Sequence, residues 1–167
     1  MLPRAKLEHI MSSLQGISHV EIIRITSRAP VYYPEMLTPE YVQWLQHYKP
    51  LVFITSFAHP YEVTEQAQQA LLELQNAGIL VLQQGPLLNG INDHSAVMKE
   101  LYEQLIQYGV LPYYAIWGIK APGVHHFMVE GTDARHIISS LENQTSGFCI
   151  PHLITLDQGN NKTRTLG

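Results

Sequence analysis

Four short apolar segments recur along the chain at intervals of roughly thirty residues, and an amphipathic segment fills each interval. The apolar segments are rich in β-branched residues, as strands are, and lie at 20–25, 51–55, 79–82 and 112–117. Apolar residues with helical spacing are found at about 7–14, 38–48, 64–77, 95–108 and 134–141. Strands that alternate with helices form βαβ units, whose crossover connections require parallel strands. The sequence therefore predicts an α/β fold.

The number of strands limits the architecture. A closed eight-stranded barrel needs about 250 residues, whereas this chain has 167. The four strands form either a small open sheet or part of a larger barrel. The first helical segment precedes the first strand, and a helix at that place normally returns from an earlier strand. It is therefore either an added helix or a sign that a strand is missing upstream.

Composition excludes several classes of protein. The net charge is −4 and no basic run exists, so nucleic acid is a poor partner. No apolar stretch approaches the roughly 18–20 residues that span a bilayer, and residues 1–7 lack the apolar centre of a signal peptide. We therefore expect a cytoplasmic protein without a membrane segment. Cys149 is the single cysteine; it can form neither an internal disulfide nor a cysteine zinc site, and we expect a small buried apolar residue.

Polar residues gather where the predicted strands end, which is where parallel α/β folds bind ligands. No pair of carboxylates dominates there, and the sequence has neither a Gly-x-Ser-x-Gly turn nor a P-loop. The polar residues at these ends are Thr26, Ser27, Arg28, Ser56, His59, Glu62, Gln83, Gln84 and Lys120.

Individual residues at these ends allow two interpretations each. His59 either contacts a ligand or bonds a backbone carbonyl. Arg28 either binds a carboxylate or phosphate as a fork or forms a surface ion pair. His125 and His126 are adjacent, and neighbours on a strand point to opposite faces, so we expect no metal site. Lys162, in a polar segment, is by itself typical of an exposed tail lysine.

Six segments, in order, resemble the lysine 2,3-aminomutase family of radical S-adenosylmethionine enzymes. The resemblance runs from about Leu2 to Lys162, and its segments are HVEIIRITSRAP (19–30), FAHPYEVT (57–64), QGPLLNGIND (84–93), PYY (112–114), GVHHF (123–127) and SGFCIP (146–151). The resemblance implies a partial (β/α) barrel with outer helices, made of the third to sixth barrel strands in residues 1–146. Residues 147–167 would form a carboxyl-terminal segment.

The family's chemistry implies cofactors and a reaction. In that family a [4Fe–4S] cluster cleaves S-adenosylmethionine to a radical. The radical removes hydrogen from an amino acid that pyridoxal phosphate holds as an imine, and the amino group then migrates to the neighbouring carbon. By motif matching, Lys162 stands where the family's lysine binds pyridoxal phosphate, although two asparagines replace part of the usual glycine run. Gln84 and His59 match positions that face S-adenosylmethionine, and Tyr113 and Tyr114 lie beside the pyridoxal site.

The resemblance also bears on the substrate and on metals. Lysine-specific members carry an aspartate where this chain has Ile119, followed by Lys120. A lysine there would repel a lysine substrate and favour an acidic amino acid, unless it points outward. Arg28 completes the candidate cofactor-binding residues. The cysteine that binds zinc in some members is His94 here, so the resemblance implies no zinc site.

Two family motifs are absent. The Cys-x3-Cys-x2-Cys loop and the Gly-Gly-Asp-Pro segment have no counterpart, and Leu2 aligns just after the second. We therefore expect the carboxyl-terminal part of an aminomutase, unable to cleave S-adenosylmethionine alone because a [4Fe–4S] cluster needs thiolates. A second, cluster-bearing polypeptide would complete it. The alternatives are a non-catalytic remnant that binds pyridoxal phosphate or a partner, and a decayed gene. An unpaired strand edge predicts poor solubility, and assembly into a homo-oligomer stays open.

Overall fold

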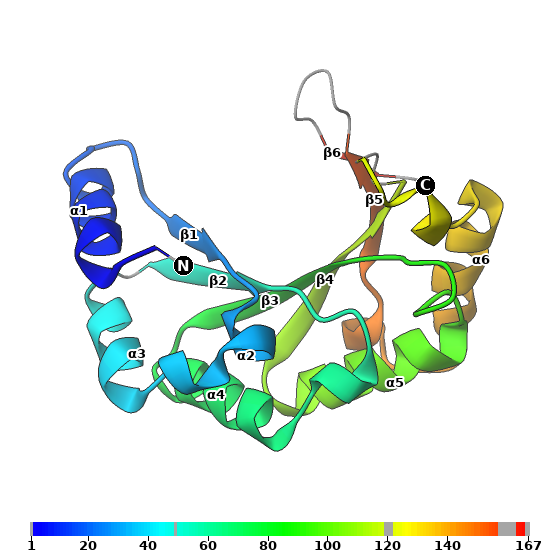
Figure 1. Ribbon diagram of the computed structural model, residues 1–167, viewed down its shortest axis with the longest axis horizontal. Helices are drawn as coiled ribbons and strands as arrows, with labels where there is room; N and C mark the ends of the chain where they lie inside the picture. Colours follow the sequence, from blue (N-terminus) through cyan, green and yellow to red (C-terminus); the bar gives the residue numbers. More distant parts are fainter. Residues whose placement is uncertain (1, 49, 119–121, 157–162, 166–167) are drawn as a thin grey trace.

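The computed structural model describes residues 2–48, 50–118, 122–156 and 163–165 (Figure 1). Its strands are β1 (Ile23–Thr26), β2 (Leu51–Thr55), β3 (Leu80–Pro86), β4 (Val110–Trp117), β5 (His152–Leu156) and β6 (Thr163–Thr165). Its α-helices are α1 (Arg4–Gln15), α2 (Ala29–Tyr32), α3 (Pro39–Leu45), α4 (Glu65–Asn76), α5 (Ser95–Gln107) and α6 (Gly131–Leu141). The 3-10 helices are η1 (Pro34–Met36), η2 (Gln46–Tyr48), η3 (Pro60–Glu62), η4 (His125–Phe127) and η5 (Gly147–Cys149).

The six strands form one sheet in the order β1-β2-β3-β4-β5-β6. The first five are parallel, and β6 is antiparallel to β5. Figure 1 shows that the sheet curves, with helices along its outer side. The predicted α/β class is confirmed, and the curved parallel sheet has the form of a partial (β/α) barrel. No helix within the described ranges is both long and apolar enough to cross a bilayer.

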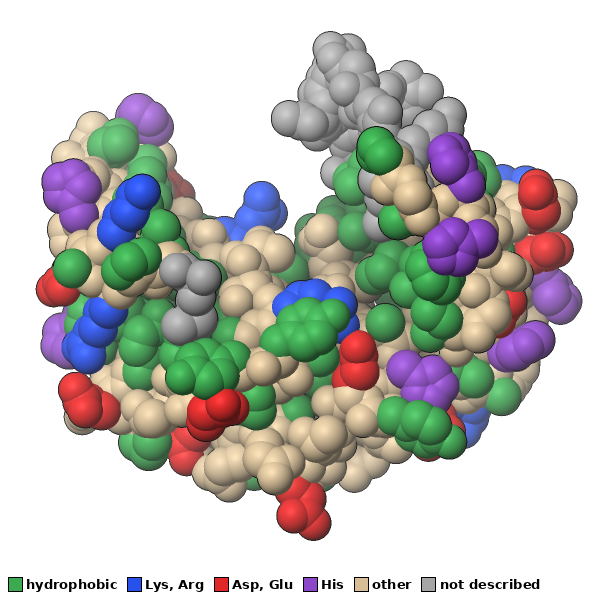
Figure 2. Space-filling view, viewed as in Figure 1, with side chains coloured by type: hydrophobic (Ala, Val, Ile, Leu, Met, Phe, Trp, Pro, Cys, Tyr) green, Lys and Arg blue, Asp and Glu red, His purple; other side chains and the backbone are tan. Residues whose placement is uncertain are grey.

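One apolar core lies between the outer face of the sheet and the helices. It takes alternate residues from the strands, because successive side chains of a strand point to opposite faces. Its members from β2 to β5 include Phe53, Val81, Ala115 and Leu153, and all are buried. The inner face carries the other alternate residues. Figure 2 shows the molecule hollowed between the side that carries α1 and the side that carries β5 and α6.

Local sequence signals fix the ends of α4, as the sequence predicts. The hydroxyl oxygen of Thr64 accepts a hydrogen bond from the Ala67 N–H at 3.2 Å and caps the helix. Gly78, with φ of 64°, ends the helix in the left-handed region. Its N–H donates to the Gln75 carbonyl at 2.7 Å, after which the chain enters β3.

Several predicted boundaries are wrong. The first strand begins at Ile23, not Val20, and includes Thr26; the third continues through Gln83 and Gln84, so these residues lie within β3, not after it. Pro86 is tolerated in β3 because the Leu87 N–H donates to Ile116 of β4. The N side of residue 86 therefore faces β2, whose pairing with β3 has already ended at Gln83. The boundary at residue 146 stays a prediction.

Candidate functional site

One row of residues crosses the inner face of the sheet. Gln84 of β3 is in register with Tyr114 of β4, which is in register with His152 of β5. The next row, which includes Ala115 and Leu153, packs in the core on the outer side. Because strand side chains alternate, the Gln84 row faces the open inner side. An amide, a phenol and an imidazole therefore line up there across three strands.

A β-bulge adds a second phenol to this row. Gln83 pairs with Pro112 and Gln84 with Tyr114, so Tyr113 is an extra residue in β4. The rings of Tyr113 and Tyr114 have centroids 3.9 Å apart, and the Tyr114 hydroxyl donates to the Tyr113 hydroxyl oxygen at 3.0 Å. The structure thus brings together two residues that the sequence predicts beside a cofactor. Their cofactor role stays a prediction.

Electrostatics links the tyrosine pair to Arg24 of β1. The hydrogen bond with Tyr113, together with partial burial, raises the pKa of Tyr114, and the positive charge of Arg24 acts on that pKa in the opposite direction. Arg24 stands between Ile23 and Ile25, which both pack toward the core, so its exposed side chain belongs to the inner face. Among the described residues, no hydrogen bond or ion pair holds the Arg24 guanidinium. A cation that no protein group pairs within the described residues, on the same face as the tyrosine pair, suits an anionic ligand.

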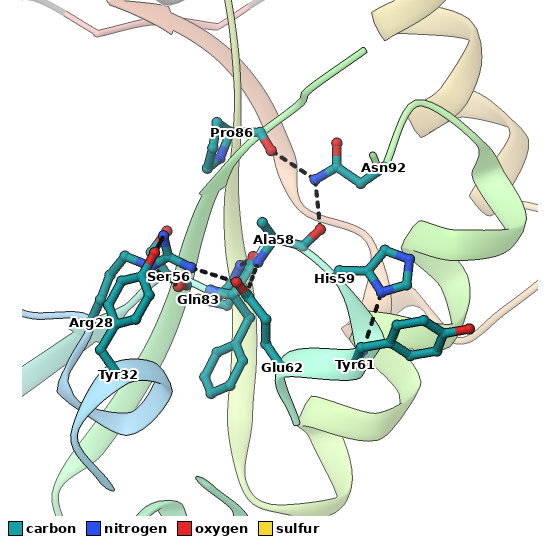
Figure 3. Close-up of polar contacts among 11 residues, drawn as sticks. Arg28, Tyr32, Ser56, Ala58, His59, Tyr61, Glu62, Gln83, Pro86 and Asn92 are labelled. Carbon is teal, nitrogen blue, oxygen red and sulfur yellow. Dashed lines mark hydrogen bonds and ion pairs between the residues drawn. The ribbon is translucent and has the colours of Figure 1, made fainter. Parts of the chain in front are cut away.

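Arg28, by contrast, is fully engaged by the protein. Its Nε donates to the Ser56 carbonyl at 2.9 Å, one terminal nitrogen donates to the Tyr32 hydroxyl at 2.7 Å, and the other meets Glu62 Oε1 at 2.7 Å. The guanidinium also lies 4.4 Å from the centre of the Tyr32 ring (Figure 3). These contacts match the ion-pair interpretation of the sequence. A cofactor contact of Arg28 stays a prediction.

His59 and Glu62 belong to the turn after β2. His59 Nδ1 accepts a hydrogen bond from the Tyr61 N–H at 3.2 Å, and the two rings stack edge to face. Glu62 Oε2 accepts from the Ala58 N–H at 2.5 Å while its other oxygen pairs with Arg28. The half-buried His59 therefore bonds a backbone N–H, not the carbonyl that the sequence interpretation named. Its proposed contact with S-adenosylmethionine stays a prediction.

Two predicted site residues lie outside the described residues. Lys120, the substrate candidate, and Lys162, the pyridoxal phosphate candidate, belong to the ranges 119–121 and 157–162. Both assignments stay predictions.

Metal-binding residues do not gather in the described ranges. No group of three or more histidine, cysteine, aspartate or glutamate side chains is placed to hold one ion there. His125 and His126 lie in the 3-10 helix η4, not on a strand as the sequence interpretation assumed. Cys149 is buried at 3% exposure, as predicted, so its thiol is not presented to the inner face for a cluster.

Sequence reasoning missed Arg24 and His152 as inner-face residues. Arg24 stands within the apolar segment 20–25, and no motif marks either residue. The alternation of Ile23, Arg24 and Ile25 was the available signal, because a charged residue between two buried ones must face the other side of the sheet. For His152, only the pairing of β5 with β4 reveals its place next to Tyr114, where the ring centroids are 6.4 Å apart.

Comparison with known proteins gives a consistent family. No protein-family model matches the sequence. The L-lysine 2,3-aminomutase of Clostridium subterminale is 41% identical over 148 residues, which are 89% of this chain and 36% of that protein. The glutamate 2,3-aminomutase of Clostridioides difficile is 36% identical over 161 residues, or 96% of this chain and 38% of that protein. The L-lysine 2,3-aminomutase of Bacillus subtilis is 36% identical over 148 residues, which are 89% of this chain and 31% of that protein.

The chain thus spans about a third of the length of these curated relatives. The matched region includes nearly all of the described fold. On this similarity, the chain belongs to the lysine 2,3-aminomutase family.

Proposed function

We propose that this chain forms the carboxyl-terminal, ligand-binding part of an amino-acid 2,3-aminomutase barrel. The observation that carries the proposal is the inner-face row of Gln84, the Tyr113–Tyr114 pair and His152. Arg24, whose guanidinium has no protein partner within the described ranges, acts through its charge on the pKa of Tyr114. The similarity to lysine and glutamate 2,3-aminomutases supplies the reaction class. A lysine at 120 favours an acidic amino acid as substrate.

The residues on the inner face fit two of the family's three cofactors. Pyridoxal phosphate is an aromatic ring with a phosphate; the Tyr113 and Tyr114 rings offer aromatic surface for the ring, and Arg24, on the same face of the sheet, offers a cation for the phosphate. Gln84 offers an amide donor and acceptor for the polar parts of S-adenosylmethionine. A [4Fe–4S] cluster does not fit, because the whole chain has one cysteine and that residue is buried.

The protein's own contribution is to bind and orient. Arg24 would hold an anionic group through its charge, and the Tyr113–Tyr114 pair would set the plane of a ring placed against it. Lys162 would attach the pyridoxal phosphate covalently. When bound, that cofactor supplies the carbonyl carbon that holds the amino group of the substrate. The phenol of Tyr114 is protonated at neutral pH, since its pKa lies above the ordinary value of about 10, so it remains a hydrogen-bond donor.

The radical step would depend on a second polypeptide that carries the cluster. The exposed edge of β1 supports this part of the proposal, since β1 pairs only with β2 among the described strands. Ile22, next to that edge, is 60% exposed. A parallel strand added there would extend the curved sheet and cover the apolar residue.

The absence of accessible thiolates favours one alternative, a non-catalytic module that binds pyridoxal phosphate or a partner. The buried Cys149 is the observation behind it. The two proposals agree on the inner face and differ in whether an amino-acid substrate binds. Calorimetry with lysine and with glutamate, in the presence of pyridoxal phosphate, separates them.

The proposal is tested by adding pyridoxal phosphate to the purified chain, reducing with borohydride and mapping the labelled peptide. We expect saturable binding with the label on Lys162, and at least a several-fold loss of affinity in Arg24→Gln. Arg4→Gln is the matched control, because Arg4 stands on α1 with an exposed partner, Glu40. Label spread over several lysines, or equal affinity in both variants, would contradict the proposed site.

A further inference from the structure

Gln83 and Asn92 are buried carboxamides, each 1% exposed. A carboxamide group removed from water is costly unless its donors and acceptor are paired. All the hydrogen bonds that the structure gives to these two side chains go to the backbone at the carboxyl-terminal edge of the sheet. Gln83 is followed in β3 by Gln84, so its side chain points to the opposite face from the inner row described above.

Gln83 pairs with both backbone groups of Phe57. The Phe57 N–H donates to Gln83 Oε1 at 2.9 Å, and Gln83 Nε2 donates to the Phe57 carbonyl at 2.7 Å. The backbone pairing of β2 with β3 ends two residues before Phe57, at the pair Thr55 and Gln83. The side chain of Gln83 therefore forms with Phe57 the two backbone hydrogen bonds that a neighbouring strand would form. It does so at the residue where the β-bulge between β3 and β4 begins.

Asn92, in the loop after β3, ties that loop to the turn after β2. Its Nδ2 donates to the Ala58 carbonyl at 2.8 Å and to the Pro86 carbonyl at 2.9 Å (Figure 3). Its Oδ1 accepts from the Leu88 N–H at 2.6 Å. Both amide hydrogens and the oxygen are thus used, and the three bonds join two loops and the end of a strand.

Gly85 is an independent sign that this packing is close. A Cβ atom at residue 85 would stand 2.7 Å from Gln83 Nε2 and 2.7 Å from the Phe57 carbonyl oxygen. Separations this short force atoms to shift. Because residue 85 is a glycine and has no Cβ, Gln83 Nε2 and the Phe57 carbonyl oxygen can approach each other and form their hydrogen bond.

We propose that Gln83 and Asn92 are positioning residues that hold the turn at 56–62 in one place relative to β3 before a ligand binds. That turn carries His59, and Arg28 is bonded to both of its ends, at the Ser56 carbonyl and the Glu62 carboxylate. Movement of the backbone at 57–58 would therefore move the polar edge beside Gln84. The consequence for ligand affinity rests on the proposed function, whereas the claim about position does not.

The test uses three variants of the purified chain and one control. Gln83→Met keeps the length of the side chain and removes both bonds to Phe57. Asn92→Leu removes all three bonds, and Asn92→Asp keeps only the acceptor for the Leu88 N–H. The control is Gln46→Met, which removes a carboxamide bond to the Ala77 carbonyl (3.0 Å) just past α4 and before β3. Amide hydrogen exchange is followed by NMR. Calorimetry measures the affinities for pyridoxal phosphate and for S-adenosylhomocysteine, which is S-adenosylmethionine without its sulfonium methyl group.

Exchange should change at particular amides. In Gln83→Met the Phe57 N–H should exchange about tenfold faster or more, relative to core amides of β4, because its acceptor is gone. The Leu88 N–H should lose protection in Asn92→Leu and keep it in Asn92→Asp, whose carboxylate still accepts. Affinity for S-adenosylhomocysteine should fall about tenfold in the three variants and less than about twofold in Gln46→Met.

Each outcome decides one claim. Unchanged exchange at Phe57 in Gln83→Met overturns the positional role. Faster exchange without a greater loss of affinity than in Gln46→Met overturns the role in ligand binding. A wild-type chain that binds neither probe contradicts the proposed function, and the exchange data still decide the positional claim. If Gln83→Met does not fold, Asn92→Asp tests the positional claim instead. Unchanged amide exchange in residues 58–62 of that variant would overturn the claim.

Discussion

The hydroxyl groups of Tyr113 and Tyr114 lie 3.0 Å apart although the two residues are neighbours in one strand. In a regular strand their side chains would point to opposite faces of the sheet. The extra residue in β4 opposite Gln83 and Gln84 brings both rings to one face. A local irregularity of the strand thus gives the inner face its paired aromatic surface.

The tyrosine pair predicts a shift in titration. In Tyr113→Phe the pKa of Tyr114 should fall toward its ordinary value of about 10, because the hydrogen bond that raises it is lost. In Arg24→Gln the same pKa should rise further, because the nearby positive charge is gone. NMR of selectively labelled tyrosine, recorded against pH, measures both shifts.

Tyr61→Phe is the control for this titration, since Tyr61 is exposed and stands on η3; it should leave the Tyr114 titration curve unchanged.

The raised pKa of Tyr114 means that the folded chain holds the proton of this phenol more tightly than the unfolded chain. The stabilisation is therefore complete below about pH 10 and is lost as the pH rises through the folded value. Movement of the Tyr114 pKa in the same direction in Tyr113→Phe and Arg24→Gln would contradict the arrangement.

Thr55→Val should stabilise the protein by about 1 kcal/mol, because the Thr55 hydroxyl is buried without a partner. Thr55 is fully buried, and its Oγ1 has no hydrogen bond within the described part of the chain. Valine has nearly the same shape and removes the unpaired polar atom. Urea unfolding measures the change in the free energy of unfolding.

Thr64→Ala is the opposite case and serves as the comparison. Thr64 caps α4 through a bond to the Ala67 N–H, so its loss should cost about 1 kcal/mol. Opposite signs for the two threonine variants are expected. A loss of stability in Thr55→Val would show that its hydroxyl has a partner after all.

Gly85→Ala should lower the free energy of unfolding by about 1–3 kcal/mol, because an added methyl group has no room there. The two atoms it would meet are Gln83 Nε2 and the Phe57 carbonyl oxygen. Gly147→Ala is the matched control, since nothing lies within 4 Å of a Cβ at that residue. Chemical denaturation of both variants should give a clear loss for the first and a change near zero for the second.

Arg28→Lys should cost about 1–2 kcal/mol even though it keeps the charge, because a lysine cannot reproduce the fork that meets Ser56, Tyr32 and Glu62. Arg4→Lys changes an exposed pair with Glu40 at 3.4 Å and should cost less than about 0.5 kcal/mol. Thermal and urea unfolding compare them. Equal small effects would mean that Arg28 is not held as described.

The sequence was sufficient for the parts of the fold that depend on local signals. The apolar run 51–55 is β2 as predicted, and Thr64 and Gly78 limit α4. These features depend on residues that are close together in the sequence, so they can be predicted without knowing which strands pair with each other. The parallel order of the strands followed from the alternation of strands and helices.

The site was harder to predict because it depends on pairing between strands. Gln83 and Gln84 are adjacent and chemically identical, yet one is buried in a hydrogen-bonded tie and the other faces the inner side. Only the register of β3 decides which is which. The bulge at Tyr113 is likewise a property of two strands together, and its effect on side-chain direction has no signature in β4 alone.

The buried thiol of Cys149 has a practical consequence. A reagent that alkylates accessible sulfur should leave the native chain nearly untouched. A cysteine introduced at an exposed position, such as Tyr61 or Asn89, would then carry a spin label or fluorophore almost without background. Such a label would report whether the turn at 56–62 or the loop after β3 changes its surroundings when another polypeptide docks.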